Sequence, residues 1–299
     1  MKKAIGIWTF FVSLLVLTAP VLGDFRVVAT YPYIGDVAKK IGGDKVKVDV
    51  LAPGNWDPHY LLPKPSYSAR VRRADLLIMN GAQLEIGWLP PIVREAANAE
   101  IQPGRKGLLD LSSVVVKIQV PRSVSREHGD VHPEGNPHYY LDPGNILRIA
   151  DAVAERMALL DPGRGDCYRD NCSNFKAEWR KRTALWTKRL APLKGCHVIQ
   201  YHRLYDYFMK RFGIQVVGEI EPLPGIPPSS RHLEGLIGLI RKQKVKYIFQ
   251  DVYHSPRPAE FLSEKTGVKI IQLPHDVGAV REARDIISLY EEIIRRLGQ

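Results

Sequence analysis

The chain contains 299 residues, and 43 Lys and Arg against 32 Asp and Glu give it a formal net charge of +11 at pH 7. A basic balance raises nucleic acid as a partner, but the positive charges are spread along the whole chain. The densest group, at 180–189, alternates with Leu185 and Trp186 at helical spacing, which indicates a solvated helix face. The charge pattern therefore argues against nucleic-acid binding.

The first 23 residues have the layout of a secretory signal peptide. Lys2 and Lys3 precede an apolar run at 5–17, and small residues lead up to Gly23. We expect cleavage after Gly23 and a periplasmic mature protein, although an uncleaved anchor stays open because the apolar character reaches Leu22. Export would carry three cysteines into an oxidising compartment, where their pairing stays open: Cys167, Cys172 and Cys196.

The remaining chain alternates short β-rich runs with helical segments, which is typical of βα units around parallel sheets. The first half offers strands at 25–30, 45–53, 74–81 and 114–120, and the second half offers strands at 197–202, 214–220, 245–251 and 268–273. This pattern predicts an α/β fold of two lobes, each with a roughly four-stranded parallel sheet flanked by helices.

A long amphipathic segment lies between the two halves. Its apolar residues are spaced by threes, fours or sevens: Tyr168, Cys172, Phe175, Trp179, Trp186 and Leu190. About 25 helical residues would reach roughly 38 Å, the length of both lobes. We therefore predict an N-terminal lobe at 24–165, one rigid connecting helix at 166–191 and a C-terminal lobe at 192–299.

Polar residues follow several of the predicted strands. His59 comes after the strand at 45–53, His202 closes the strand at 197–202, and Asp251 closes the strand at 245–251. His275 and Asp276 follow the last strand in the same way. In open α/β sheets, ligands bind beyond the carboxyl ends of the strands, so these positions are candidates for one site between the lobes.

The stretch HGDVHPEGNPHYYLDP, at 128–143, brings three of the nine histidines within eleven positions. His138 lies between Pro137 and the start of a helix, which fixes it in place. His128 and His132 are flanked by Gly, Pro and acidic residues, a composition that builds exposed loops. We expect His138 to be buried and the other two to belong to an exposed loop.

Histidines that converge from both lobes, together with a carboxylate, would form the tetrahedral shell that suits Zn²⁺. Three nitrogens and one oxygen disfavour Mg²⁺ and Ca²⁺, which prefer oxygen ligands, whereas Mn²⁺ and Fe²⁺ stay open. The residues thus predict a transition-metal site and leave the identity of the metal undecided.

Four segments carry a family resemblance: 56–85 (WDPHYLLPKPSYSARVRRADLLIMNGAQLE), 136–145 (NPHYYLDPGN), 197–213 (HVIQYHRLYDYFMKRFG) and 267–279 (GVKIIQLPHDVGA). In this order and over nearly the whole mature chain, the sequence resembles the metal-binding receptors of bacterial zinc and manganese ABC importers. The resemblance implies two α/β lobes joined by a long helix, and one metal buried between them. It also implies that this metal is handed to a membrane permease.

The resemblance also implies a set of ligands. Carried over residue by residue, the ligands are His59, His138, His202 and Asp276. Relatives that carry manganese or iron tend to have Glu at the position of His202, so His at this position favours zinc. Asp251 and His254 remain alternatives for the fourth ligand, Glu221 is a candidate to orient a ligating imidazole, and His128 and His132 are candidates to gather metal.

We therefore expect a periplasmic solute-binding protein, monomeric and not an enzyme, that captures Zn²⁺ as its transported ligand and delivers it to an ABC permease. Four protein ligands would leave no position for an activated water, which separates capture from hydrolysis. The alternatives are the same receptor with Mn²⁺ or Fe²⁺ as cargo, a secreted zinc-dependent hydrolase, and a surface adhesin whose metal is structural. The hydrolase is disfavoured because the chain has no His-Glu-x-x-His pair.

Overall fold

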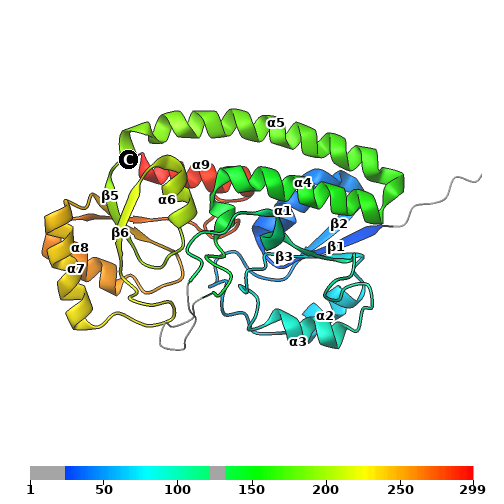
Figure 1. Ribbon diagram of the computed structural model, residues 1–299, viewed down its shortest axis with the longest axis horizontal. Coiled ribbons are helices and arrows are strands. Elements are labelled where there is room, and N and C mark those ends of the chain that lie inside the picture. The colour runs from blue at the N-terminus through cyan, green and yellow to red at the C-terminus, as the bar shows by residue number, and fades with distance from the viewer. Residues whose placement is uncertain (1–23, 122–131, 299) are drawn as a thin grey trace, which may run out of the picture.

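The computed structural model describes residues 24–121 and 132–298, which fold into two lobes side by side (Figure 1). The predicted signal peptide and its cleavage point lie outside the described residues, as does His128. Within the two described ranges, no helix has both the length and the apolar character needed to cross a membrane.

The N-terminal lobe is built on a parallel sheet with the order β2-β1-β3-β4. Its strands are β1 (Phe25–Ala29), β2 (Val46–Val50), β3 (Leu76–Met79) and β4 (Leu108–Asp110). Its helices are α1 (Pro32–Gly42), α2 (Pro65–Arg72), α3 (Leu89–Ala96) and α4 (Pro143–Leu160). Helices α1 and α4 cover one face of the sheet, and α2 and α3 lie on the opposite side (Figure 1).

The C-terminal lobe repeats the arrangement with a parallel sheet in the order β6-β5-β7-β8. Its strands are β5 (His197–Gln200), β6 (Gln215–Glu219), β7 (Tyr247–Gln250) and β8 (Lys269–Gln272). Its helices are α6 (Asp206–Phe212), α7 (Ser230–Gln243), α8 (Arg257–Thr266) and α9 (Ile286–Leu297). The predicted fold class, two four-stranded parallel sheets flanked by helices, is confirmed.

One predicted strand is wrong. The fourth strand of the first sheet is β4, at Leu108–Asp110, and not the segment 114–120. Val116 and Val120 in that segment are exposed. The segment instead bridges the lobes, because Ile118 accepts a backbone hydrogen bond from Asn136 and its own N–H donates to the hydroxyl of Tyr207. Its β-branched residues favour a strand, but the segment lies beyond the end of β4 and is not part of the sheet.

The long connecting helix is present as α5 (Gly165–Leu190), which runs along the length of the molecule (Figure 1). It packs against α4 and α1 and also against α9, the last helix of the chain. Helix α9 likewise contacts α1 in the N-terminal half. The C-terminal element thus returns to the N-terminal half, and the lobe boundaries at 165 and 191 stay a prediction.

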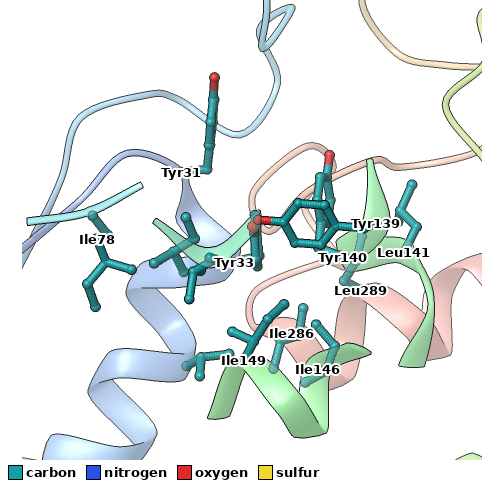
Figure 2. Packing of buried hydrophobic residues seen from close by; sticks show 14 of the residues in the cluster. Tyr31, Tyr33, Ile78, Tyr139, Tyr140, Leu141, Ile146, Ile149, Ile286 and Leu289 are labelled. Atoms are coloured by element: carbon teal, nitrogen blue, oxygen red, sulfur yellow. The ribbon is translucent and has the colours of Figure 1, made fainter. Parts of the chain in front are cut away.

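A continuous apolar core crosses from one lobe to the other. Tyr33 on α1 stacks on Tyr140 with ring centroids 4.2 Å apart. Figure 2 shows this pair above residues of α4 and α9, among them Ile146, Ile149 and Ile286. Since opening the lobes would expose this buried surface to water, the core favours a closed, nearly rigid body. The loops at the carboxyl ends of the two sheets are therefore held in fixed positions relative to each other between the lobes.

Candidate metal site

Three histidines from distant parts of the chain meet between the lobes. His59 lies in the loop after β2, His138 lies just before the short 3₁₀ turn Tyr139–Leu141, and His202 lies directly after β5. One ring nitrogen from each lies within 4.8 Å of the other two. Among the described residues, this triad is the group of His, Cys, Asp and Glu side chains arranged to hold a metal ion.

The separations of the three rings match metal coordination. The ring centroid of His59 lies 5.2 Å from that of His138 and 5.2 Å from that of His202. The centroids of His138 and His202 are 5.4 Å apart. Imidazoles that bind one tetrahedral Zn²⁺ through nitrogens at about 2.0–2.1 Å have centroids about 5 Å apart. The triad is therefore close to a coordinating arrangement.

Asp57 fixes the orientation of His59. Its Oδ1 lies 2.7 Å from Nδ1 of the imidazole and accepts the backbone N–H of His59 at 2.9 Å. The other ring nitrogen, Nε2, is buried and has no hydrogen-bond partner among the described residues. A carboxylate that accepts from Nδ1–H leaves the lone pair of Nε2 directed at the triad.

Glu221 does the same for His202. It follows β6, the strand that neighbours β5, and its Oε2 lies 2.5 Å from Nδ1 of His202. Its second oxygen accepts the N–H of Gly225 at 2.8 Å, which fixes the carboxylate. The contact agrees with the orienting role that the sequence predicts for Glu221.

His138 is the most enclosed of the three, with 1% of its surface exposed. The side chain of Asn136 accepts its backbone N–H at 2.9 Å and so fixes the main chain. Neither ring nitrogen has a hydrogen-bond partner among the described residues. Because a buried polar group without a partner costs about 1–3 kcal/mol in stability, we expect this imidazole to bind a ligand.

The surroundings keep the imidazoles of His59 and His138 neutral. Burial lowers the pKa of His59 below its usual value, and the neighbouring His202 lowers it further, against the opposing effect of Asp57. Burial, with the neighbouring histidines, holds the pKa of His138 well below 6.5. Metal binding requires neutral imidazole, so both side chains are in the binding form at neutral pH.

The structure does not bring Asp276 into the donor set that lies within 4.8 Å. Its Oδ1 accepts the N–H of Tyr33, in the first turn of α1, at 2.9 Å and the N–H of Val277 at 2.6 Å. The carboxylate thus caps a helix of the opposite lobe, and burial raises its pKa well above the ordinary value.

The two alternative fourth ligands also lie outside the donor set. Asp251 and His254 are paired with each other, with Oδ2 and Nδ1 2.8 Å apart. Nε2 of His254 lies 4.0 Å from Oε1 of Glu221. The pair of Asp251 and His254 therefore lies next to Glu221, the residue whose carboxylate orients His202.

His132 differs from the sequence prediction, which placed it in an exposed loop. It is partly buried, and its ring stacks on that of His59 with centroids 5.3 Å apart. The cause is a tight turn in which the N–H of Gly135 donates to the carbonyl of His132. Gly135 has a φ of 101°, and a Cβ there would meet the carbonyl oxygen of Ile118 at 2.8 Å, so the turn packs directly on the bridging segment.

The sequence alone did not reveal the role of Asp57, because an aspartate directly before a proline, here Pro58, is typical of a turn. The signal was its spacing, since a carboxylate two residues before a histidine can reach Nδ1 of that ring. The partly buried position of His132 had no comparable local signal.

A family model matches nearly the whole of the described chain. The model described as zinc-uptake complex component A, periplasmic, matches residues 27–299. Apart from the first two residues of β1, that range includes both sheets, the connecting helix and all three histidines of the triad.

Curated relatives are similar over most of the chain. An iron-binding protein of Yersinia pestis, YfeA, is 26% identical over 82% of this chain and 75% of its own length. A manganese ABC transporter substrate-binding lipoprotein of Streptococcus mitis, PsaA, is 25% identical over 90% of this chain and 88% of its own length. The zinc-binding lipoprotein AdcA of Streptococcus pneumoniae is 21% identical over 83% of this chain and 49% of its own length.

Solved structures share the fold. A crystal structure of ZnuA covers 92% of this chain and 98% of its own, with a TM-score of 0.79 and 25% identity. A cadmium-bound periplasmic metal-binding protein from Candidatus Liberibacter asiaticus covers the same shares with a TM-score of 0.77 and 19% identity. The chain therefore belongs to the family of the periplasmic component A of zinc-uptake complexes, the substrate-binding proteins of metal ABC transporters.

Proposed function

We propose that this protein is a periplasmic receptor that captures Zn²⁺ between its lobes and delivers it to the permease of an ABC importer. The observation that carries the proposal is the triad of His59, His138 and His202, whose donor nitrogens lie within 4.8 Å of one another. A cation bound there would satisfy Nε2 of His59 and one of the two buried ring nitrogens of His138, which have no partner among the described residues.

The choice of zinc rests on the donor atoms. The named relatives include iron and manganese proteins, so family membership alone leaves the cargo open. The triad offers three imidazole nitrogens, whereas Mn²⁺ prefers carboxylate, carbonyl and water oxygens. Zinc also binds a given nitrogen site more tightly than manganese or iron(II) does. The donor atoms and the order of metal affinities therefore both favour zinc over manganese and iron(II).

A competition titration of the purified protein tests the cargo. We expect one Zn²⁺ per chain and no displacement of that zinc by a thousandfold excess of Mn²⁺ or Fe²⁺, a ratio equivalent to about 4 kcal/mol of preference. Displacement at equal concentrations would contradict zinc as the cargo and favour the manganese or iron receptor.

Capture fits the site better than hydrolysis. A zinc hydrolase needs a carboxylate or imidazole free to act as general base beside the metal. The carboxylates next to the triad, Asp57 and Glu221, are each engaged with a ring nitrogen of the triad. They therefore support the ligands. We propose a monomer that is not an enzyme, and the permease is its partner.

Replacement of Glu221 by alanine should weaken zinc binding by roughly 10- to 100-fold, the usual cost of losing a group that orients a ligating imidazole. Glu221→Gln should lose less, because its amide oxygen can still accept from Nδ1–H of His202. The measurement is the zinc dissociation constant by competition with a chelating dye. Glu234→Ala, an exposed acidic residue on α7, is the matched control and should bind as the unchanged protein does. Equal affinities for all three variants would remove Glu221 from the site.

Asp276 as the fourth ligand stays a prediction. Its carboxylate would have to reach the metal while Oδ1 keeps both of its backbone hydrogen bonds, to Tyr33 and Val277. Only Oδ2 would then be available to the ion. Nothing in the contacts of the triad depends on Asp276.

A further inference from the structure

A second cavity, separate from the metal site, lies in the N-terminal lobe. It has a volume of about 600 Å³ and lies between α3 and the carboxyl ends of β3 and β4. Helix α3 is on the side of the sheet opposite to α1 and α4 (Figure 1). The volume falls in the range of roughly 300–1,000 Å³ that is usual for small-molecule sites. The carboxyl ends of parallel strands are also where α/β sheets bind ligands.

Much of the wall of this cavity is apolar. Met79 of β3 and Leu108 of β4 line it on the side of the sheet, and Leu89 and Val93 line it on the side of α3. Ile86, which precedes the helix and also lines the cavity, is 64% exposed and continues the apolar surface to the outside. A ligand with aliphatic side chains would therefore gain free energy by leaving water for this cavity.

One end of the cavity is acidic. Glu85 is 1% exposed, and its carboxylate accepts the hydroxyl of Thr30 at 2.8 Å. It also accepts the N–H groups of Asn80 and Gly81 at 2.6 and 3.0 Å. No cationic side chain of the described residues pairs with this carboxylate, and burial raises the pKa of Glu85 to about 7. Asp110 lies against the same glycine, because a Cβ there would be 1.8 Å from its Oδ1. A cationic group of a ligand would supply the missing counter-charge.

The other end of the cavity carries a positive charge. Arg94 lies in the last turn of α3 and lines the cavity together with Gln102. At a rise of 1.5 Å per residue, Arg94 is about 7.5 Å along the helix from Leu89, whereas Glu85 precedes the helix. The side chain of Arg94 is exposed, and no carboxylate within 24–121 and 132–298 pairs with it. A guanidinium in this state can form two parallel hydrogen bonds with the carboxylate of a ligand.

We propose that this cavity binds a short apolar peptide, with the terminal ammonium group at Glu85 and Asp110 and the terminal carboxylate at Arg94. In a free amino acid both charged groups are attached to one Cα, whereas each further residue of an extended chain adds roughly 3.3–3.6 Å. A di- or tripeptide therefore spans the two ends of the cavity. Its aliphatic side chains pack against Leu89 and Val93. The peptide site does not depend on the proposed capture of metal between the lobes.

Calorimetric titration of the full-length mature protein with the dipeptide Leu-Leu tests the proposal. A chelator keeps the protein free of metal, so that the peptide cannot bind through a metal ion at the triad. We expect one peptide per chain. Leu-Leu with an acetylated amino terminus and Leu-Leu with an amidated carboxyl terminus should each bind at least about tenfold more weakly, because each lacks one charged partner. These comparisons use the unchanged protein and do not depend on the folding of a variant.

A substitution locates the peptide within the cavity. Arg94→Met keeps the aliphatic stem and removes the charge, so Leu-Leu should bind at least about tenfold more weakly. The amidated peptide should bind this variant as it binds the unchanged protein, because it has no carboxylate to lose. Arg105→Met, at an exposed arginine of the same lobe that does not line the cavity, is the matched control and should bind Leu-Leu normally. No binding at millimolar peptide, equal affinity for all three forms of the peptide, or undiminished affinity in Arg94→Met would each overturn the proposal.

Discussion

We expect His138→Ala to abolish the stabilisation of the protein by zinc while leaving the metal-free protein folded. His138 is the most enclosed member of the triad, and neither of its ring nitrogens has a partner among the described residues. Its removal deletes a ligand without breaking a side-chain hydrogen bond. A ligand at a thousand times its dissociation constant stabilises the native state by about 4 kcal/mol, and the variant should lose nearly all of this.

The measurement is the free energy of unfolding with and without zinc, from denaturant titrations of the unchanged protein and the variant. His197→Ala is the matched control, because His197 begins β5, at the end of that strand opposite to His202, and its ring contacts Gln243 and Gln215. The control should keep the full effect of zinc. If the variant is unfolded, and the unchanged protein also unfolds when zinc is withdrawn, the metal is structural, as in the adhesin alternative.

His59 and His138 should add nothing to the pH dependence of zinc affinity as the pH falls through 6.5, and should weaken binding only at lower pH. Protons compete with zinc for an imidazole only below the pKa of that imidazole in the folded, metal-free protein. Burial sets the pKa of His59 below 6.5 and that of His138 well below it. An exposed site with ordinary pKa values near 6.5 would lose about tenfold in affinity per pH unit for each histidine below that pH.

The sign of this effect follows from the state of the free protein. Because burial lowers the pKa of His59 and of His138, zinc displaces no proton from either imidazole until the pH falls below that lowered pKa. Below the lowered pKa, each of the two histidines adds about tenfold per pH unit. Dissociation constants measured from pH 8 to pH 4 by competition test this. A decline steeper than about tenfold per pH unit that starts at pH 6.5 would show that His59 and His138 are solvated and not buried.

Much of the fold could be predicted because it depends on local patterns. Strands such as β5 and β7 are short apolar runs between helices, and the spacing of Trp179, Trp186 and Leu190 sets one face of the long helix α5. The segment 114–120 is wrongly predicted as a strand because strand propensity depends on neighbouring residues. Its position outside the sheet depends on contacts with residues that are distant in the sequence. The packing of α9 against α1 and α5 likewise depends on contacts with residues far away in the sequence.

The candidate site divides in the same way. His59 and His202 could be placed because the carboxyl ends of parallel strands meet at one edge of each sheet, and His138 because a proline and a helix start hold it. The burial of His132 could not be predicted, since it depends on the packing of Gly135 against Ile118, a segment read as a strand. The position of Asp276 after the last strand could be predicted, whereas its hydrogen bond with the N–H of Tyr33 could not, because that bond depends on how the two lobes pack.

The most direct test of a shared cation is a crystal structure of the zinc-loaded protein with anomalous diffraction at the zinc edge. We predict one strong anomalous peak between the lobes, about 2.0–2.1 Å from a nitrogen of each of His59, His138 and His202. A peak bound elsewhere, or one that any of these three imidazoles fails to reach, would contradict the proposed site.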